Sequence, residues 1–270
     1  MNVRNDKGPR NEPRKLKVFG ERNTGTRAVM QMLRNLKNVS IASPNPIVAE
    51  LDGLEKQARD KLKGFHRKLF IDALEDERRS RLTGISGWKH CAPQIDHSYA
   101  ETETCVLFLV RDPYSWIVSL TRRPYNCRTP KIDKIDEFIE RPWLTMRRDN
   151  IAPVLSSPIG LWNEKLRAYR AFSRAAPVPS TLLKFEDFVQ APVAALAGVL
   201  EQFEISHNGL AELEEPTKAG GMERAERQGY YAREGWKAKI SPHTAALINA
   251  NVDWDIARSF GYEMRDPESF

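Results

Sequence analysis

The chain has 270 residues, enough for one large α/β domain with a sizeable core or for two small domains. Hydrophobic residues make up 41% of it and charged residues 29%, which fits an ordinary soluble globular protein. The net charge of +6 favours anionic partners such as nucleotides, sulfated or phosphorylated sugars, nucleic acid or acidic membranes. A basic surface without any ligand would give the same charge.

The cysteines and the N-terminal residues indicate the compartment. Cys91, Cys105 and Cys127 are odd in number and include no C-x-x-C pair, so we expect a reducing compartment and neither a disulfide scaffold nor a structural zinc site. The first residues contain no apolar segment of the kind a signal peptide needs. The longest tight apolar run, residues 105–110, is too short to span a bilayer. We therefore expect a soluble, cytoplasmic protein without a membrane span.

The N-terminal part of the chain predicts an arm, a strand and a helix. Residues 1–15 are polar, basic and rich in Asn, Pro and Gly, which is typical of a flexible basic arm. A short strand is expected at residues 16–20. The following residues 24–37 carry apolar side chains at i, i+3, i+4 and i+7 from Val29, the pattern of one helix face. A second strand is expected at residues 39–42.

The middle of the chain contains the clearest strand. Residues 50–83 are charged and mostly helical in pattern, and residues 84–88 are a candidate third strand. Residues 105–110 are continuously apolar, as expected of a central parallel strand that is buried on both faces. A helix should begin near Pro113. Residues 121–157, rich in Arg, Pro and Asp, predict an irregular insertion.

The C-terminal part of the chain is well delimited by capping residues. A helix over residues 159–169 and a strand at residues 181–185 are expected, after which Asp187 can cap another helix. Ser241, followed by proline, predicts a helix start. Asp253 predicts the N-cap of a last short helix.

The alternation of strands and helices predicts a three-layer α/β/α fold with a central parallel sheet and a P-loop-like nucleotide-binding core. No internal repeat divides the chain, so we expect a single domain over residues 16–262, followed by a tail at 263–270. In such sheets, ligands bind beyond the carboxyl ends of the strands.

The first candidate site is the loop at residues 20–27, between the first strand and the first helix. Unpaired N–H groups of a helix start and the helix dipole favour an anion there, and Gly25 lets the backbone approach a phosphate closely. The candidate side-chain contacts of this loop come from Arg22, Asn23, Thr24, Thr26 and Arg27.

This loop has the G-x-x-x-x-G spacing of P-loop kinases and NTPases. Thr26 and Arg27 stand where a P-loop has Lys and then Ser or Thr, so the lysine that reaches the β- and γ-phosphates is missing. A glycine-containing turn without a ligand is the alternative.

The second candidate site follows the central strand. Arg111 ends that strand, and Ser119 lies eight residues further on, about two turns into the next helix. Together the two side chains could hold one phosphate, because the guanidinium fork suits phosphate oxygens. Two alternatives are an ion pair between Arg111 and a carboxylate, and a Mg²⁺-binding role for Asp112.

These two sites resemble those of sulfotransferases that use 3′-phosphoadenosine-5′-phosphosulfate (PAPS). An apolar strand followed by R-D-P-Y-x-x-x-x-S resembles their 3′-phosphate motif, which places Arg111 and Ser119 on that phosphate. Residues 22–27 resemble their 5′-phosphosulfate loop, usually K-S-G-T-T, with Gly25 on the family glycine. Asn23 then stands in place of the family lysine, and Arg22 would replace its charge.

Three further segments are similar to the same family. Residues 181–188 resemble a strand followed by (Y/F)-E-D-(L/F), and residues 230–262 resemble the closing segment of bacterial members. Arg227 and Gly229 stand at an imperfect match to the family's R-K-G, which implies two more nucleotide contacts. The resemblance covers about a third of the chain, in the expected order.

Lys89 and His90 are the candidate catalytic pair. They follow the predicted strand at 84–88 and resemble a K-x-H stretch of many sulfotransferases, with a spacing one residue shorter. A histidine near its ordinary pKa can take the proton of an acceptor hydroxyl, while Lys89 or Arg22 stabilises the developing charge. A structural histidine, or a glutamate as the base, are the alternatives.

The resemblance implies transfer of the sulfuryl group of PAPS to a hydroxyl or amine of a small-molecule or carbohydrate acceptor, with no metal required. If residues 121–157 form a lid over the acceptor, their charge favours an acidic or sugar-like molecule. The alternatives are a P-loop kinase or NTPase and a non-enzymatic binder of RNA or another polyanion. The sequence has no RNP-type signature, so nucleic acid is not an expected partner.

Overall fold

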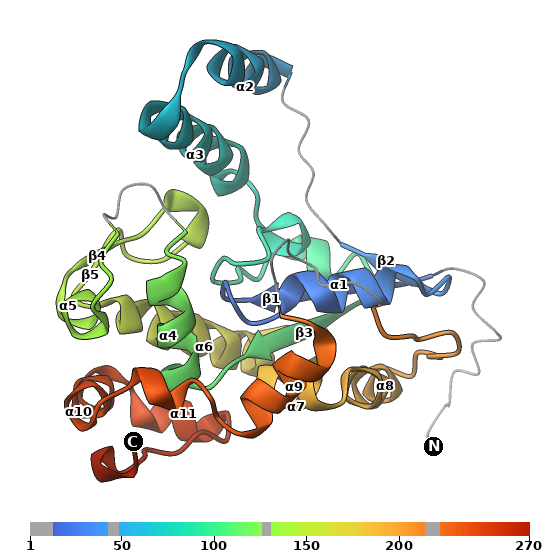
Figure 1. The fold of residues 1–270 in the computed structure, drawn as a ribbon. Coiled ribbons are helices and arrows are strands. Elements are labelled where there is room, and N and C mark those ends of the chain that lie inside the picture. The colour runs from blue at the N-terminus through green and yellow to red at the C-terminus, as the bar shows by residue number, and fades with distance from the viewer. Residues whose placement is uncertain (1–12, 43–48, 126–130, 214–221) are drawn as a thin grey trace.

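A four-stranded parallel sheet forms the centre of the protein. The computed structural model describes the chain over residues 13–42, 49–125, 131–213 and 222–270 (Figure 1). The strands lie in the order β2-β1-β3-β6, and every neighbouring pair is parallel. Their bounds are β1 Arg14–Gly20, β2 Val39–Ile41, β3 Thr104–Val110 and β6 Ser180–Lys184. The predicted parallel α/β class is confirmed.

Alternation along the central strands divides the core between the two faces of the sheet. Leu107 and Leu109 of β3 pack with the apolar side chains of α1 and α8, whereas Phe108 and Val110 pack with those of α4, α6, α10 and α11. Helices therefore cover both faces, which gives the three layers. These helices are α1 Thr26–Arg34, α4 Pro113–Arg122, α6 Pro158–Ala175, α8 Pro192–Gln202, α10 Pro242–Asn251 and α11 Trp254–Ser259.

The remaining elements lie around this core. Helices α2 (Ala49–Lys61) and α3 (Gly64–Ser80) project from the body as a helical arm (Figure 1). Two short helices, α7 (Phe185–Gln190) and α9 (Arg224–Ala232), lie near the carboxyl end of β6 and pack on each other. None of the helices in the described ranges combines the length and apolar character that crossing a bilayer requires.

The predicted helix starts are confirmed by their capping bonds. Asp112 accepts a hydrogen bond from Ser115 N at the start of α4, and Ser241 accepts one from Thr244 N at the start of α10. Asp253 caps α11 in the same way. Of the cysteines, Cys91 and Cys105 are buried free thiols, and Cys127 lies outside the described residues.

The strand predicted at 84–88 is wrong. The segment begins with a 3₁₀ turn, η1 (Gly84–Ser86), and Gly87 N donates to Gly84 O over 3.0 Å. Gly84 has φ +52°, a conformation that side-chain-bearing residues rarely adopt, and an added Cβ would collide with the Asp96 carboxylate. The backbone therefore turns where an extended strand was predicted.

Three other expectations need adjustment. Asp187 does not cap a helix: it lies inside α7, and α8 begins only after Ala191. The first strand begins at Arg14, two residues before its predicted start at residue 16, and residues 1–12 of the predicted basic arm lie outside the described part of the chain. Helix α1 is shorter than the predicted 24–37 because it begins only after the left-handed Gly25.

The described part of the insertion 121–157 is partly ordered into short elements that contribute to the core. It forms α5 (Ile135–Glu140) and a hairpin of β4 (Trp143–Leu144) and β5 (Val154–Leu155). Phe138 and Trp143 are fully buried, so these two side chains fasten the segment to the body of the protein, and the role of the insertion as a lid stays a prediction. The residues of the insertion that line the cavity described next are the short run 122–125.

Candidate functional site

A cavity of about 660 Å³ lies where the loop after β1, the end of β3 and helices α7 and α9 meet. Its size is that of a small-ligand site. Eight cationic side chains and one carboxylate line it, and that carboxylate, Glu212, is paired with Arg224. The cavity is therefore built for an anion. The cations are Arg22, Arg27, Lys89, Arg111, Arg122, Arg123, Arg224 and Arg227.

The loop 20–27 forms one wall of this cavity, as the sequence predicted. Asn23 has φ 68° and Gly25 has φ 85°, so two left-handed residues curl the backbone. No side chain caps the start of α1, which leaves that helix end to an incoming anion. An added Cβ at Gly25 would press on the Phe185 ring at 3.3 Å.

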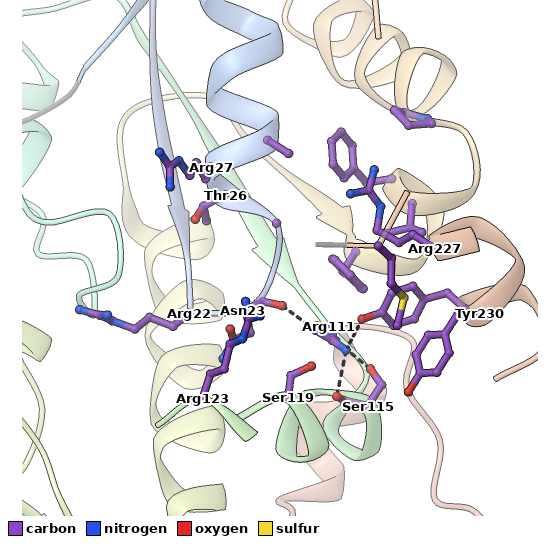
Figure 2. A pocket seen from close by; sticks show the side chains of 18 of the residues that line it. Arg22, Asn23, Thr26, Arg27, Arg111, Ser115, Ser119, Arg123, Arg227 and Tyr230 are labelled. Carbon is purple, nitrogen blue, oxygen red and sulfur yellow. Dashed lines mark hydrogen bonds between the residues drawn. The ribbon is translucent and has the colours of Figure 1, made fainter. Parts of the chain in front are cut away.

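The structure separates the predicted loop contacts into two groups. Asn23, Gly25, Thr26 and Arg27 line the cavity, and Figure 2 shows Thr26 and Arg27 along the first turn of α1. Thr24 does not line it. Its buried hydroxyl donates to Glu21 O over 2.6 Å and stabilises the turn instead.

Arg111 is the most firmly held cation of the cavity. Its Nε donates to Ser115 Oγ and its Nη2 to Ser115 O, both over 2.9 Å, while Nη1 donates to Asn23 O over 2.7 Å (Figure 2). Nη2 also donates to Tyr231 Oη over 3.1 Å. These bonds use four of the five N–H donors of a guanidinium, so one N–H of Nη1 is left for a ligand.

Ser119, the residue predicted to hold a phosphate together with Arg111, is not the serine that supports the arginine. Ser119 lines the cavity on α4, but the serine that bonds to Arg111 is Ser115, one turn earlier. The alternative of an ion pair does not describe the site, since no carboxylate in the described ranges pairs with Arg111. Asp112 is also committed elsewhere: it caps α4 and lies 3.5 Å from Arg265, and it does not line the cavity.

Lys89 and His90 lie in a turn that is bound to the end of β1. Gly20 N donates to Lys89 O over 2.9 Å, and His90 Nδ1 lies 2.5 Å from Gly20 O. A carbonyl oxygen only accepts, so Nδ1 carries the proton of the neutral ring. Both side chains reach the cavity although the predicted strand is absent.

The electrostatics of this turn favour a neutral histidine. Burial lowers the pKa of His90 well below its ordinary value of 6.5, and the positive charges of Arg22 and Lys89 lower it further. The pKa of Lys89 is lowered to about 8, mainly by burial and to a smaller extent by the positive charges of Arg34 and Arg79. At pH 7 the pair therefore consists of a neutral imidazole, able to accept a proton at Nε2, and a cationic ammonium.

Arg22 extends away from Arg111, on the other side of the loop (Figure 2). Its guanidinium lies 4.2 Å from the Tyr125 ring centroid and 5.1 Å from that of Trp88. Burial lowers the pKa of Arg22, yet a guanidinium stays charged at neutral pH. The two predicted anion contacts, Arg22 and Arg111, thus lie on opposite sides of the loop.

Behind the loop lies a buried polar cluster that the sequence analysis missed. Lys165 is fully buried and donates to His90 O over 2.7 Å and to Asp149 O over 2.8 Å. Glu21 Oε2 lies 3.9 Å from Lys165 Nζ, and burial raises the pKa of Glu21 to about 7. The cluster fixes the positions of the loop and of the histidine turn. No local pattern marks Lys165 as different from a lysine on the surface of a helix.

Helix α9 provides the wall opposite the loop. Arg227 lines the cavity as predicted, but Gly229 does not, because it faces the next turn and its carbonyl accepts from Arg233 N. Tyr230 and Tyr231 of the same helix also line the cavity. These aromatic rings were missed, although two adjacent tyrosines in a charged helix were a visible signal.

Comparison with known proteins gives a distant similarity in structure. No protein-family model and no curated protein matches the sequence. A sulfotransferase domain from the Synechococcus PCC 7002 olefin synthase matches with a TM-score of 0.43 and 14% identity, over 96% of this chain and 98% of that one. A sulfotransferase domain from the curacin biosynthetic pathway matches with a TM-score of 0.40 and 13% identity, over 95% and 100%.

A third match is the sulfotransferase STF9 from Mycobacterium avium, with a TM-score of 0.34 and 11% identity, over 95% of this chain and 79% of that one. The protein is thus similar to solved sulfotransferases at low identity. The function proposed below rests on the residues of the cavity.

Proposed function

We propose that this protein is a sulfotransferase that moves the sulfuryl group of PAPS to a hydroxyl or amine of an acceptor. The observation that carries the proposal is the single cavity onto which the loop 22–27, Arg111 and the Lys89–His90 turn all open. Eight cationic side chains and one carboxylate line this cavity, and such an excess of positive charge suits a nucleotide with several anionic groups.

Each part of the donor has a matching part of the cavity. The helix start at Gly25 and Thr26 suits the 5′-phosphosulfate, and the free N–H of Arg111, with Ser119, suits the 3′-phosphate. The rings of Tyr230 and Phe188 line the same cavity and offer faces on which an adenine can stack.

The proposed step is an in-line transfer. The acceptor oxygen forms a bond to sulfur as the bond between sulfur and the 5′-phosphate oxygen breaks, and the acceptor proton passes to Nε2 of His90. The products are the sulfated acceptor and 3′,5′-adenosine bisphosphate. By analogy with phosphoryl transfer, positioning and charge stabilisation supply most of the rate. Lys89 is the cation beside His90 that can balance charge on the leaving phosphate.

Thermal unfolding with added ligands tests this proposal. We expect 3′,5′-adenosine bisphosphate to raise the Tm without Mg²⁺, because a ligand that binds the native state stabilises it. ATP with Mg²⁺ and a short oligonucleotide serve as the competing ligands. Stabilisation by ATP–Mg²⁺ alone would favour a kinase, and stabilisation by the oligonucleotide alone would favour a polyanion binder; either result rejects the proposal.

A further inference from the structure

A second cavity, of about 340 Å³, lies between the helical arm and the loop that follows β1. It shares Arg22 and Tyr125 with the cavity of about 660 Å³, which we call the nucleotide cavity after its proposed ligand, so the two cavities meet at these side chains. Five cations line the second cavity, and three of them come from the arm itself. The five are Arg22, Arg59, Arg67, Lys68 and Arg148.

The carboxylates of this cavity do not neutralise its charge. Asp72 is engaged by Arg148 at 2.5 Å, and Glu75 is engaged by Arg79, outside the cavity, at 2.6 Å. Arg59 is paired with Glu55. No carboxylate in the ranges that the structure describes forms an ion pair with the other three cations, which are Arg22, Arg67 and Lys68.

Two of the cations lie beside the same aromatic ring, and their charges repel each other. The guanidinium of Arg22 lies 5.1 Å from the centroid of the Trp88 ring, and that of Arg148 lies 4.9 Å from it. Arg148 is only 3% exposed. The Nε atoms of both arginines are buried and have no hydrogen-bond partner. Arg148 is compensated by Asp72, whereas Arg22 has no carboxylate partner among the described residues, and an oxyanion in the second cavity would offset the repulsion that Arg22 experiences.

The position of the second cavity connects it to the reaction. Arg22 and Tyr125 separate it from the nucleotide cavity, which Lys89 and His90 line. A molecule in the second cavity therefore approaches the donor from the side opposite Arg111. The arm is fixed to the body of the protein beside this cavity. Arg148 N donates to Asp76 Oδ1 over 2.9 Å, which connects η3 (Arg147–Asp149) to α3.

We propose that the second cavity is the acceptor site and that the acceptor carries an oxyanion group, a carboxylate or a sulfate, held by Arg22, Arg67 and Lys68. This inference rests on the proposed function, since it assigns the acceptor of that reaction. The group binds on the arm side, and the hydroxyl or amine to be sulfated points to the border at Tyr125. The class of acceptor is thus an acidic one, such as a uronic acid, a sulfated sugar or an aryl carboxylate.

Three phenols that differ in the charge of one substituent test the inference. The probes are 4-hydroxyphenylacetate, 4-ethylphenol and tyramine, titrated into the protein saturated with 3′,5′-adenosine bisphosphate. We expect the anionic probe to bind at least about tenfold more tightly than tyramine at low salt, and the preference to shrink as salt screens the exposed cations. Equal binding of the three probes, or no binding of the anionic one at about 10 mM, would overturn the inference.

A double variant and its matched control locate the binding. Arg67→Ala/Lys68→Ala removes two exposed cations that line the cavity, and Lys56→Ala/Lys61→Ala removes two exposed cations of α2 that do not. Arg67→Ala/Lys68→Ala should weaken binding of 4-hydroxyphenylacetate by at least about fivefold, and Lys56→Ala/Lys61→Ala by less than about twofold. Loss of binding in both variants alike, or in neither, would contradict the assigned site.

The two proposals can fail separately. Binding of 3′,5′-adenosine bisphosphate is measured first and without the probes. If the nucleotide binds but the anionic probe shows no preference, the acceptor inference is wrong and the proposed function stands. If the nucleotide does not bind, the proposed function is wrong, and the same titration with the free protein still decides whether the cavity takes an oxyanion.

Discussion

The two cavities hold their positive charge in different ways. Arg111, in the nucleotide cavity, is 3% exposed, and four of its N–H groups form hydrogen bonds with the protein. Arg67 and Lys68, in the second cavity, are exposed on α3, and no carboxylate in the described ranges is paired with them. A buried, hydrogen-bonded cation fixes the geometry of a ligand, whereas an exposed one attracts a ligand through a field that salt screens.

This difference has a measurable consequence. A substitution of Arg111 removes a side chain that holds the loop at Asn23 and helix α4 at Ser115, so it should change affinity and stability together. A substitution on the arm removes charge alone and should change affinity without changing stability. The predictions below test the nucleotide side of this comparison, from the largest expected effect to the smallest.

Substitution of His90 should have the largest effect, and on turnover only. His90→Asn removes the proton acceptor but keeps a side-chain amide that can donate to Gly20 O, as Nδ1 does. We expect kcat to fall by about 10²–10⁴-fold, the usual range for a general base, with affinity for 3′,5′-adenosine bisphosphate within about twofold. The measurement is sulfuryl transfer from PAPS to a phenol that the wild type accepts.

The acid side of the pH profile provides the control for His90. Because its pKa is lowered well below 6.5, the ring is already neutral at pH 6.5, and the rate should not fall between pH 7.5 and that value. A folded His90→Asn protein with wild-type turnover would place the base elsewhere.

Removal of the Arg111 side chain should weaken nucleotide binding and lower stability. Arg111→Ala loses a charge-assisted contact worth about 1.5–3 kcal/mol, or roughly 10- to 150-fold in Kd. It also leaves Asn23 O and Ser115 without their partner, so the Tm should fall. Calorimetry with 3′,5′-adenosine bisphosphate and a thermal melt measure the two effects.

Arg174→Ala is the matched control for Arg111, since this exposed arginine of α6 lines neither cavity. It should bind the nucleotide like the wild type and keep the wild-type Tm. Wild-type affinity in Arg111→Ala as well would remove the 3′-phosphate assignment.

Sequence patterns predicted the parts of the site that depend on neighbouring residues. A continuous apolar run can only be a buried strand or helix segment, and a run of this length that ends at Arg111 is a strand. The loop at Gly25 was predictable for a similar reason, because strand, glycine and helix follow one another directly. In both places the local preference and the final fold agree.

The parts that were missed depend on contacts between distant residues. Lys165 reaches His90 from α6, and Arg148 reaches Asp72 across 76 positions of the chain. No local pattern marks these side chains, because a buried and a surface lysine of a helix look the same in sequence. The strand predicted at 84–88 is absent because the glycine at 84 allows a turn that the side chains of Asp96 and Ser98 stabilise.

The charge of Lys89 should make nucleotide affinity depend on pH. Lys89 is charged below its pKa of about 8 and neutral above it, so binding of the anionic donor should weaken as the pH rises from 7 to 9.5. The expected change is roughly three- to tenfold in Kd, less than for Arg111, because a bound anion raises the pKa of the lysine again. Lys89→Met should bind more weakly at pH 7 and show no such slope; a slope that persists in this variant would assign it to another group.

Substitution of Ser119 should have the smallest effect, and its contrast with Ser115 tests the comparison directly. Both are serines of α4 that line the cavity, but Ser115 is buried and accepts hydrogen bonds from Arg111, whereas Arg111 does not donate to Ser119. Ser119→Ala should weaken binding of 3′,5′-adenosine bisphosphate by about 0.5–1 kcal/mol, roughly two- to fivefold, and leave the Tm unchanged. Ser115→Ala should instead lower the Tm, because it frees the guanidinium that the serine holds. If Ser119→Ala changes the Tm and not the affinity, Ser119 belongs to the packing of α4, and Arg111 alone carries the 3′-phosphate.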